Sequence, residues 1–119
     1  MDRRTAREEA FKILFQQDIN QNSQEINKQL NDYIRSVVLG VIDKKNEIDQ
    51  LISEHIHNWS YDRIALVEKT ILRIAAYEIT YMEDIPVGVS INEAVELAHT
   101  YGDEKSGQFV NGVLSNIIE

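Results

Sequence analysis

The chain of 119 residues has no cysteine, a single proline and no long run of apolar residues. Without cysteine it can form neither a disulfide framework nor a reactive thiolate. Its longest apolar stretch, at positions 37–42, is interrupted by Gly40 and is far too short to span a membrane. The charged opening MDRRTAREE is not followed by the apolar run of a signal peptide. We therefore expect one cytoplasmic domain, and the scarcity of proline among many helix-forming residues favours an all-α fold.

Basic residues are also scarce, because 12 lysines and arginines stand against 20 aspartates and glutamates, a net charge of -8. General nucleic-acid binders usually neutralise phosphates with a basic surface, so this balance argues against one and confines any RNA contact to a local patch. The sequence also has no P-loop, no glycine-rich dinucleotide turn and no nucleophile motif. We therefore expect neither an enzyme nor a cofactor.

Two Glu-x-x-His pairs, Glu54 with His57 and Glu96 with His99, have the spacing that di-iron bundles use. Helical geometry places both pairs opposite the apolar residues of their segments, where they should face water. We expect no metal site.

Residues 85–114 carry the strongest helix signals. Pro86 should end an incoming helix, and Ser90 with Glu93 has the pattern of a capping box. This predicts an extended connector at 87–89, a helix from Ile91 to about Gly102, and a final helix from about residue 104. In the final helix the core stripe consists of Val110, Val113, Leu114, Ile117 and Ile118. Phe109 and Asn111 fall at the margins of that stripe and Gln108 points away from it, so the Phe109 ring either packs on a neighbouring helix or is available to a ligand.

The first helix is predicted to run to about residue 20, capped either by Thr5 in a box with Glu8 or by Asp2. It holds the single basic cluster of an acidic chain, which consists of Arg3, Arg4 and Arg7 with Lys12 further along. Phe11 and Phe15 follow Arg7 at steps of four residues, which suits base stacking beside phosphate contacts. The alternative is a solvated helix start with internal ion pairs.

The middle of the chain predicts a helix after a cap at Ser23, with a bend or break near residues 44–46, and a central helix from Arg63 to about Met82. The broad apolar side of the central helix should make it the spine of the fold. Glu68 and Glu78 lie on or near that side, where an unpaired carboxylate would be costly. Glu78 could pair with an arginine of another helix, and Glu68, near the helix start, could reach the surface beside a partner. For both carboxylates the alternatives are pairing inside the fold or facing a partner.

Three segments together resemble a known family: INEAVELAHTYGDEKSGQFVNGVL, LRIAAYEI before the proline, and the arginine-rich first helix. They are similar to the NusB family of bacterial transcription antitermination factors over nearly the whole chain. The resemblance implies two roughly perpendicular helical sub-bundles of about six to seven helices in one domain. It also implies a non-catalytic role, in which the protein binds boxA RNA together with the small-subunit ribosomal protein NusE, within the RNA polymerase antitermination complex of ribosomal RNA operons.

Carried over position by position, the resemblance assigns residues to two surfaces. The RNA-binding residues would be Arg3, Arg4, Arg7, Phe15, Gln108, Phe109 and Asn111. The protein-partner residues would be Glu68, Arg73 and Tyr77. Phe15 replaces a tyrosine of some relatives, which removes a hydroxyl but keeps a stacking ring. The connection before DYIRSVVLGV is shorter than is usual in the family, which leaves a separate short second helix open.

Two other functions remain open from the sequence. NusB-like domains also precede some ribosomal RNA cytosine methyltransferases, although this chain has no methyl-donor motif. A homodimerising interaction module would use the same surfaces, so the chain could be a monomer or a homodimer.

Overall fold

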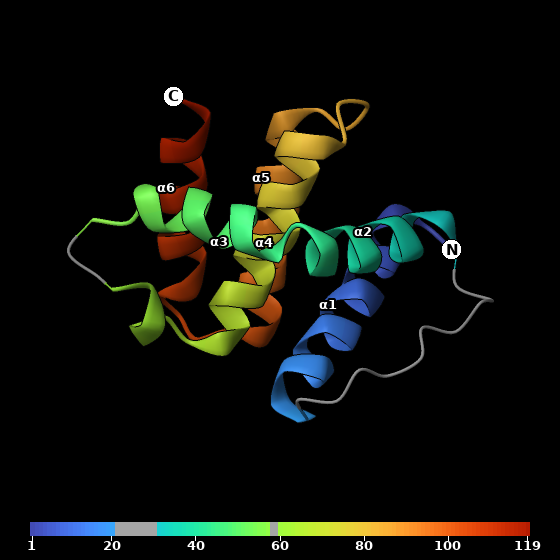
Figure 1. Cartoon of the computed structure of the whole chain (residues 1–119), viewed down its shortest axis with the longest axis horizontal. Helices are drawn as coiled ribbons and strands as arrows, with labels where there is room; N and C mark the ends of the chain where they lie inside the picture. Colours follow the sequence, from blue (N-terminus) through green and yellow to red (C-terminus); the bar gives the residue numbers. More distant parts are fainter. Residues whose placement is uncertain (21–30, 58–59) are drawn as a thin grey trace.

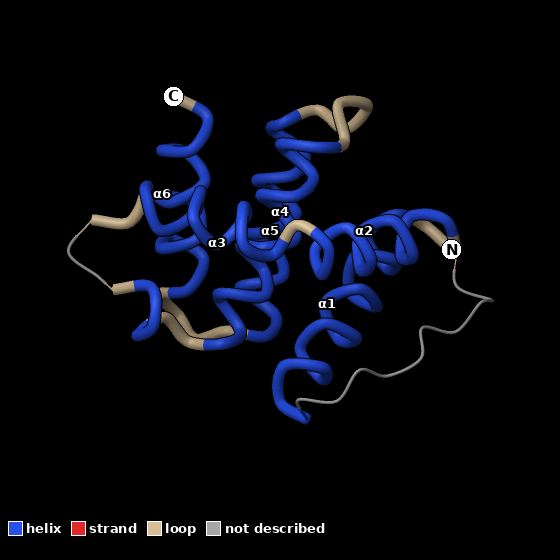
Figure 2. The backbone as a smooth tube through the Cα atoms, in the orientation of Figure 1, coloured by secondary structure: helices blue, strands red, loops and turns tan. Residues whose placement is uncertain are grey.

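The computed structural model describes residues 1–20, 31–57 and 60–119 of the chain (Figure 1). All regular structure in these ranges is helical, which confirms the all-α prediction (Figure 2). None of the described helices is long and apolar enough to cross a membrane. The elements are α1 (Arg3–Asn20), α2 (Asp32–Asp43), α3 (Lys45–Glu54), the short 3₁₀ helix η1 (Tyr61–Arg63), α4 (Leu66–Tyr81), α5 (Val87–Tyr101) and α6 (Ser106–Ile118).

The helices form two groups joined by α4. Helices α1 and α2 pack on each other at one end of the molecule, and α5 packs on α6 at the other (Figure 1). Helix α4 contacts α1, α2, α3, α5 and α6, which confirms its expected place as the spine. Helices α2 and α3 run across the direction of α4, α5 and α6, as expected for two crossed sub-bundles (Figure 1).

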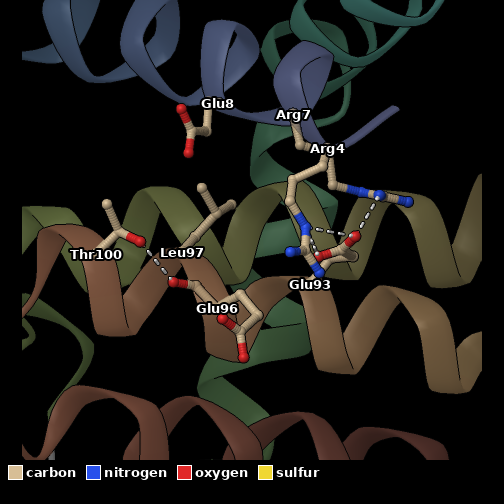
Figure 3. Close-up of a pocket in the computed structure, with 7 residues that line it drawn as sticks. All are labelled: Arg4, Arg7, Glu8, Glu93, Glu96, Leu97 and Thr100. Carbon is tan, nitrogen blue, oxygen red and sulfur yellow. Dashed lines mark hydrogen bonds and ion pairs between the residues drawn. The ribbon is translucent and has the colours of Figure 1, made fainter. Parts of the chain in front are cut away.

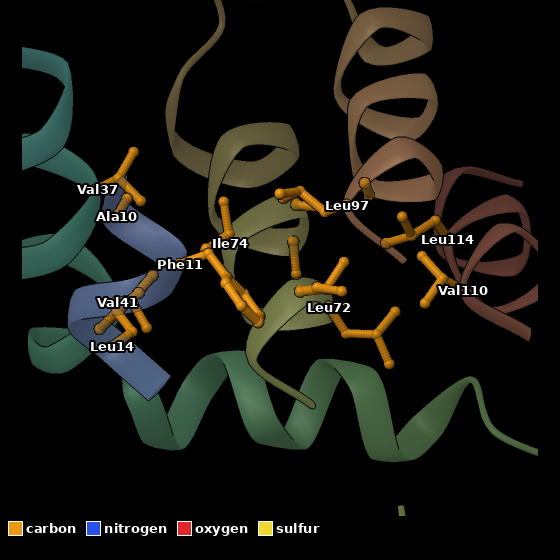
Figure 4. Packing of buried hydrophobic residues seen from close by; sticks show 14 of the residues in the cluster. Ala10, Phe11, Leu14, Val37, Val41, Leu72, Ile74, Leu97, Val110 and Leu114 are labelled. Carbon is orange, nitrogen blue, oxygen red and sulfur yellow. The ribbon is translucent and has the colours of Figure 1, made fainter. Parts of the chain in front are cut away.

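One apolar core runs through both groups. Leu72 and Ile74 of α4 lie in its middle, with side chains of α1 and α2 on one side and of α5 and α6 on the other (Figure 4). Leu72 is fully buried and Ile74 is 2% exposed. Each large side chain buried to this degree contributes about 1.5–3 kcal/mol of apolar transfer free energy. This shared core fixes the position of α1 relative to α5 and α6.

Local capping explains where the first helices begin. Asp2 Oδ1 accepts the Thr5 N–H at 2.8 Å, so Asp2 and not Thr5 caps α1. This hydrogen bond lowers the pKa of Asp2, because it stabilises the carboxylate. Asn31 caps α2 in the same way through the Ile34 N–H. Lys44 separates α2 from α3, so the expected irregularity at 44–46 is a break. The expected cap at Ser23 lies outside the described residues.

Two predicted boundaries are wrong. Helix α5 begins at Val87 directly after Pro86, and residues 87–89 are its first turn instead of an extended connector. Ser90 does not form the predicted capping box, because its hydroxyl donates to the buried Glu78 carboxylate at 2.8 Å. Helix α4 begins at Leu66, because the segment before it forms η1.

Candidate nucleic-acid interface

Four of the hollows on the described part of the surface lie beside α5 or the segment that follows it, and six of the seven residues predicted to bind RNA line them. Helix α1 borders α5 on one side and α6 borders it on the other. The hollows are described below by the side chains that line each one.

Arg4 lies where two of these hollows meet. The first, of about 170 Å³, lies between α1 and α5 and is also lined by Glu93, Glu96 and Thr100 (Figure 3). The second, of about 500 Å³, lies between α5 and α6 and is lined by Arg4, Asn92, Val95, Glu96, His99, Gly107, Gln108 and Asn111. The fold therefore brings Arg4 together with Gln108 and Asn111, from opposite ends of the sequence.

Glu93 of α5 holds Arg4 in place. Arg4 Nε donates to the two Glu93 carboxylate oxygens at 3.3 and 3.1 Å, and this hydrogen bonding raises the pKa of Arg4. The Arg4 side chain is 66% exposed. Within the described ranges its Nη1 and Nη2 groups form no hydrogen bond. They are available to a phosphate, for which a guanidinium offers two parallel donors.

Arg7 also lines the first hollow, but its side chain is buried, so the expectation of an exposed cluster of three arginines is wrong. Its side chain is 3% exposed and points into the interior between α1, α4 and α5. Nε donates to Glu78 Oε2 at 2.8 Å and Nη2 donates to Oε1 at 2.9 Å. Burial alone would lower the pKa of Arg7, but the hydrogen bonds and charge of Glu78 raise it, so the guanidinium stays charged. The expected pairing of Glu78 with an arginine of another helix is confirmed.

Glu78 joins four helices through its two oxygens. Besides Arg7 of α1, it accepts hydrogen bonds from the Tyr33 hydroxyl of α2 and the Ser90 hydroxyl of α5. Its side chain is 1% exposed. A carboxylate this deeply buried is stabilised only if its lone pairs are satisfied, and here both oxygens are. Arg7, Tyr33 and Ser90 with Glu78, here called the Glu78 junction, therefore orient α1 and with it Arg3 and Arg4.

Arg3 lies at the exposed start of α1. Its guanidinium carbon is 4.6 Å from the centroid of the Tyr33 ring, a cation–π contact that leaves the outer face of the guanidinium in solvent. Arg3 and Arg4 are thus the members of the arginine cluster that remain at the surface.

Phe15 lines a third hollow, of about 300 Å³, that is mostly aromatic and apolar. Its other lining residues are Phe11, Lys12, Gln16, Val67 and Tyr101. The rings of Phe11 and Tyr101 stack with centroids 4.8 Å apart, and the centroid of Phe15 lies 5.7 Å from that of Phe11. Phe15 is half-buried, so part of its ring remains accessible beside the exposed Lys12.

Phe109 lines a fourth hollow, of about 230 Å³, on the other side of α6 from Gln108 and Asn111. Its neighbours there are Arg63, Ile64, Glu68, Asp103 and Lys105. Phe109 is half-buried, which confirms its marginal position beside the core stripe. The four hollows thus place Phe15 and Phe109 in different recesses from Arg4, Gln108 and Asn111.

The three residues assigned to a protein-partner surface are dispersed. Glu68 lines the Phe109 hollow, and Tyr77 packs its ring against Gly40 and against Tyr81, 5.1 Å away. Arg73 is 7% exposed, so its expected surface position is wrong.

Arg73 is held by two carboxylates of other helices. It donates to Asp49 from Nε at 2.8 Å and from Nη2 at 3.1 Å, and to Asp18 from Nη1 at 3.0 Å. Burial alone would lower the pKa of Arg73, but its hydrogen bonds to Asp49 and the charges of Asp49 and Asp18 raise it. Arg73 therefore ties α1, α3 and α4 together.

Sequence reasoning missed three residues that line these hollows. Arg63 was assigned to the first turn of the central helix, whereas it lies in η1 and lines the fourth hollow together with Phe109. Lys105 and Tyr101 flank the predicted end of α5, where the direction of a side chain depends on how the chain turns. In the sequence only a local pattern marks these two residues: the aromatic Tyr101 directly precedes Gly102, and the cation Lys105 follows it.

The Glu-x-x-His pairs are exposed. The side chains of Glu96 and His99 are 56% and 58% exposed, with 4.0 Å between His99 Nδ1 and Glu96 Oε1. No group of three or more metal-ligating side chains occurs among the described residues.

Comparison with known proteins gives one consistent result. The profile of the NusB family matches residues 4–119. A "Transcription antitermination protein NusB" of Oceanobacillus iheyensis is 56% identical over 125 residues, which cover 99% of each chain. Among solved structures, T. maritima NusB is similar with a TM-score of 0.90 and 35% identity, over 98% of this chain and 90% of that one. A structure of NusB and NusE in complex with dsRNA is similar with a TM-score of 0.84 and 31% identity, over 97% and 94%.

Proposed function

The chain belongs to the NusB family, and from this premise we propose that it is a transcription antitermination factor that binds boxA RNA together with the ribosomal protein NusE. The observation that carries the proposal is the similarity over nearly its whole length to a NusB chain that was solved with NusE and double-stranded RNA. The role is one of binding and not of catalysis. As part of the RNA polymerase antitermination complex, the protein would act in the bacterial cytoplasm. The full-length relatives carry the antitermination name, which favours this function over a domain of a ribosomal RNA methyltransferase.

The proposed RNA surface consists of the four hollows described above. Arg3 and Arg4 would contact phosphates, Phe15 and Phe109 would stack on bases, and the amides of Gln108 and Asn111 would hydrogen-bond to the strand. Arg7 would support this surface through the Glu78 junction, because its guanidinium is already used there. On the protein-partner side, we propose direct contacts for Glu68 and Tyr77 and a supporting role for Arg73.

The acidic net charge of the chain is the reason why the proposal includes a basic protein partner. With Arg7 and Arg73 paired inside, at most ten of the 12 lysines and arginines remain for the surface of a chain that has 20 aspartates and glutamates and a net charge of -8. A basic ribosomal protein would be attracted to this chain and would add positive charge along the RNA. We expect the chain alone to bind boxA RNA at around micromolar Kd and NusE to tighten binding at least tenfold, a coupling of about 1.4 kcal/mol.

A titration of labelled boxA RNA tests the proposal, with the chain alone, with NusE alone and with both. Arg4→Glu should weaken binding at least tenfold. Lys45→Glu makes the same charge change at the junction of α2 and α3 and should have a much smaller effect. Equal losses in the two variants would show that only overall charge matters. Purely additive binding of the two proteins would rule out a composite RNA site.

A further inference from the structure

His99 lines the second hollow, between α5 and α6, and the proposed function gives it no role. It is one of three histidines in the chain, and the other two line none of the four hollows described above. Its side chain is 58% exposed, and Nδ1 lies 4.0 Å from Glu96 Oε1. Within the described ranges Nε2 forms no hydrogen bond, so this ring nitrogen is available to a ligand.

The backbone of α6 determines where the His99 ring lies. A Cβ at Gly107 would be 2.5 Å from His99 Nε2 and 2.7 Å from Cδ2, so the ring edge that carries Nε2 lies directly over this glycine. Gln108, the next residue, and Asn111, one turn further along α6, line the same hollow. Because Gly107 has no side chain, the His99 ring lies against α6 beside these two amides.

The charge of this hollow depends on whether His99 carries a proton. Its other charged lining residues are Arg4 of α1 and Glu96 of α5, and the residues that α6 contributes carry no charge. With His99 neutral, the charges of Arg4 and Glu96 cancel. With His99 protonated, the lining has a net positive charge. An imidazole ordinarily gains its proton between about pH 7 and pH 6, so a small change of pH switches the charge of the hollow.

We propose that His99 is a further RNA-contacting residue, which when protonated binds a phosphate in the second hollow beside Arg4 and so strengthens RNA binding at mildly acidic pH. This inference rests on the proposed function, because the phosphate is that of the RNA. Both nitrogens of an imidazolium are donors, so Nδ1 can face Glu96 while Nε2 donates to a phosphate oxygen. A neutral ring has one N–H and no charge, so this contact weakens as the pH rises.

Other groups of the chain that titrate in this range can be told apart from His99. His55 Nδ1 lies 2.7 Å from the Leu51 carbonyl oxygen, at the end of α3, and His57 is exposed outside the four hollows. The N-terminal amine ordinarily titrates at about pH 7.7 to 8. Any response from these groups remains when His99 alone is replaced, so a single variant separates them from His99.

The test is the binding of labelled boxA RNA to the full chain at about pH 8 and about pH 6, over a series of salt concentrations, with and without NusE. Affinity should be about two- to fivefold higher at the lower pH, which is the contribution of one solvent-exposed ion pair. The log of affinity should also fall more steeply with the log of salt concentration at the lower pH, by about 0.7, because one more phosphate is neutralised.

Three variants identify the titrating group, and circular dichroism at each pH checks that they keep the helical fold. His99→Gln keeps a polar side chain that cannot gain a proton, so its affinity should stay near the lower value at both pH values. His99→Lys carries a positive charge at both pH values, so its affinity should stay near the higher value. His57→Gln is the matched control and should keep the response of the wild type, because His57 lines none of the four hollows.

The outcomes separate this inference from the proposed function. If RNA binds and His99→Gln keeps the full pH response, the inference is overturned and the proposed function stands. An affinity that rises at the lower pH with no change in salt slope also overturns the inference, because the proton then adds no phosphate contact. If no RNA binds at either pH, even with NusE present, both are overturned.

Discussion

The Glu78 junction predicts that replacing Arg7 and replacing Arg4, two arginines of the same helix, have very different effects on the free energy of unfolding. Replacing Arg7 with Met keeps a long side chain but removes both hydrogen bonds to Glu78. The carboxylate, which is 1% exposed, then retains only the Tyr33 and Ser90 hydroxyls as partners. Removing one member of a buried ion pair costs about 3–5 kcal/mol, because it leaves an uncompensated charge in the interior.

This loss is large compared with the stability of a small domain. Domains of this size have a free energy of unfolding of about 5–15 kcal/mol, so Arg7→Met should remove a substantial part of it. Urea unfolding followed by circular dichroism should show a clearly lower midpoint with an unchanged slope. Arg4→Met is the internal control, because its ion pair with Glu93 is exposed to solvent. It should leave the midpoint nearly unchanged.

A double-mutant cycle tests the physical reason. Once Arg7 is replaced, Glu78→Met removes the orphaned carboxylate, so the double variant should be more stable than the sum of the two single losses predicts. A coupling energy near zero would show that the two side chains do not act as a pair. If the urea midpoint of Arg7→Met is as close to that of the wild type as the midpoint of Arg4→Met is, the argument from burial is refuted.

Three further predictions concern packing, pH and salt. A Cβ at Gly40 would overlap the Tyr77 ring, so Gly40→Ala should lower the free energy of unfolding by about 1–3 kcal/mol in urea unfolding. Burial and the neighbouring Glu78 raise the pKa of Tyr33, so stability is full below the unfolded tyrosine pKa of about 10 and falls as the pH rises above it. Urea midpoints between pH 8 and 11 should show this fall, and Tyr33→Phe should reduce it. The log of RNA affinity of the isolated chain should fall by no more than about 2 to 3 per tenfold rise in salt, because Arg3, Arg4 and few other surface cations meet phosphates; a steeper slope in filter binding would contradict this count.

The helices were predictable because their apolar periodicity is strong. The stripe of α6 and the broad apolar side of α4 both follow 3.6-residue spacing, and both helices are present, although α4 begins at Leu66 and not at Arg63. The error at Ser90 has a tertiary cause. A capping box is a local pattern, but the Ser90 hydroxyl lies within reach of a buried carboxylate of α4, which needs donors more than a helix end exposed to water does. Helix α5 starts at Val87, directly after the proline and about one turn earlier than predicted.

The candidate site was only partly predictable, because neighbours in sequence can differ completely in burial. Arg4 and Arg7 look alike in the sequence, yet Arg7 falls in the stripe of Ala6, Ala10 and Phe11 that packs on the core. The useful signal was present: an arginine in one apolar stripe and Glu78 in another predict a buried pair. The prediction paired Glu78 with an arginine of another helix but did not identify that arginine as Arg7, which was expected to bind RNA. Which surface residues share a hollow depended on tertiary packing and could not be read from spacing.

Some arginines pair with carboxylates inside the fold and others remain at the surface, and this difference determines how RNA can bind. Arg7 and Arg73 each satisfy carboxylates inside the fold, so the structure uses two of its cations to join helices. What remains for RNA is a narrow set of surface cations beside accessible aromatic rings, on a chain whose net charge repels phosphate. Such a surface gains affinity mainly from stacking, which any base can provide, and from hydrogen bonds to base edges, which depend on the base; it gains little from charge. An acidic binding protein of this kind is therefore suited to selecting an RNA sequence, while the basic partner supplies the attraction to the RNA backbone.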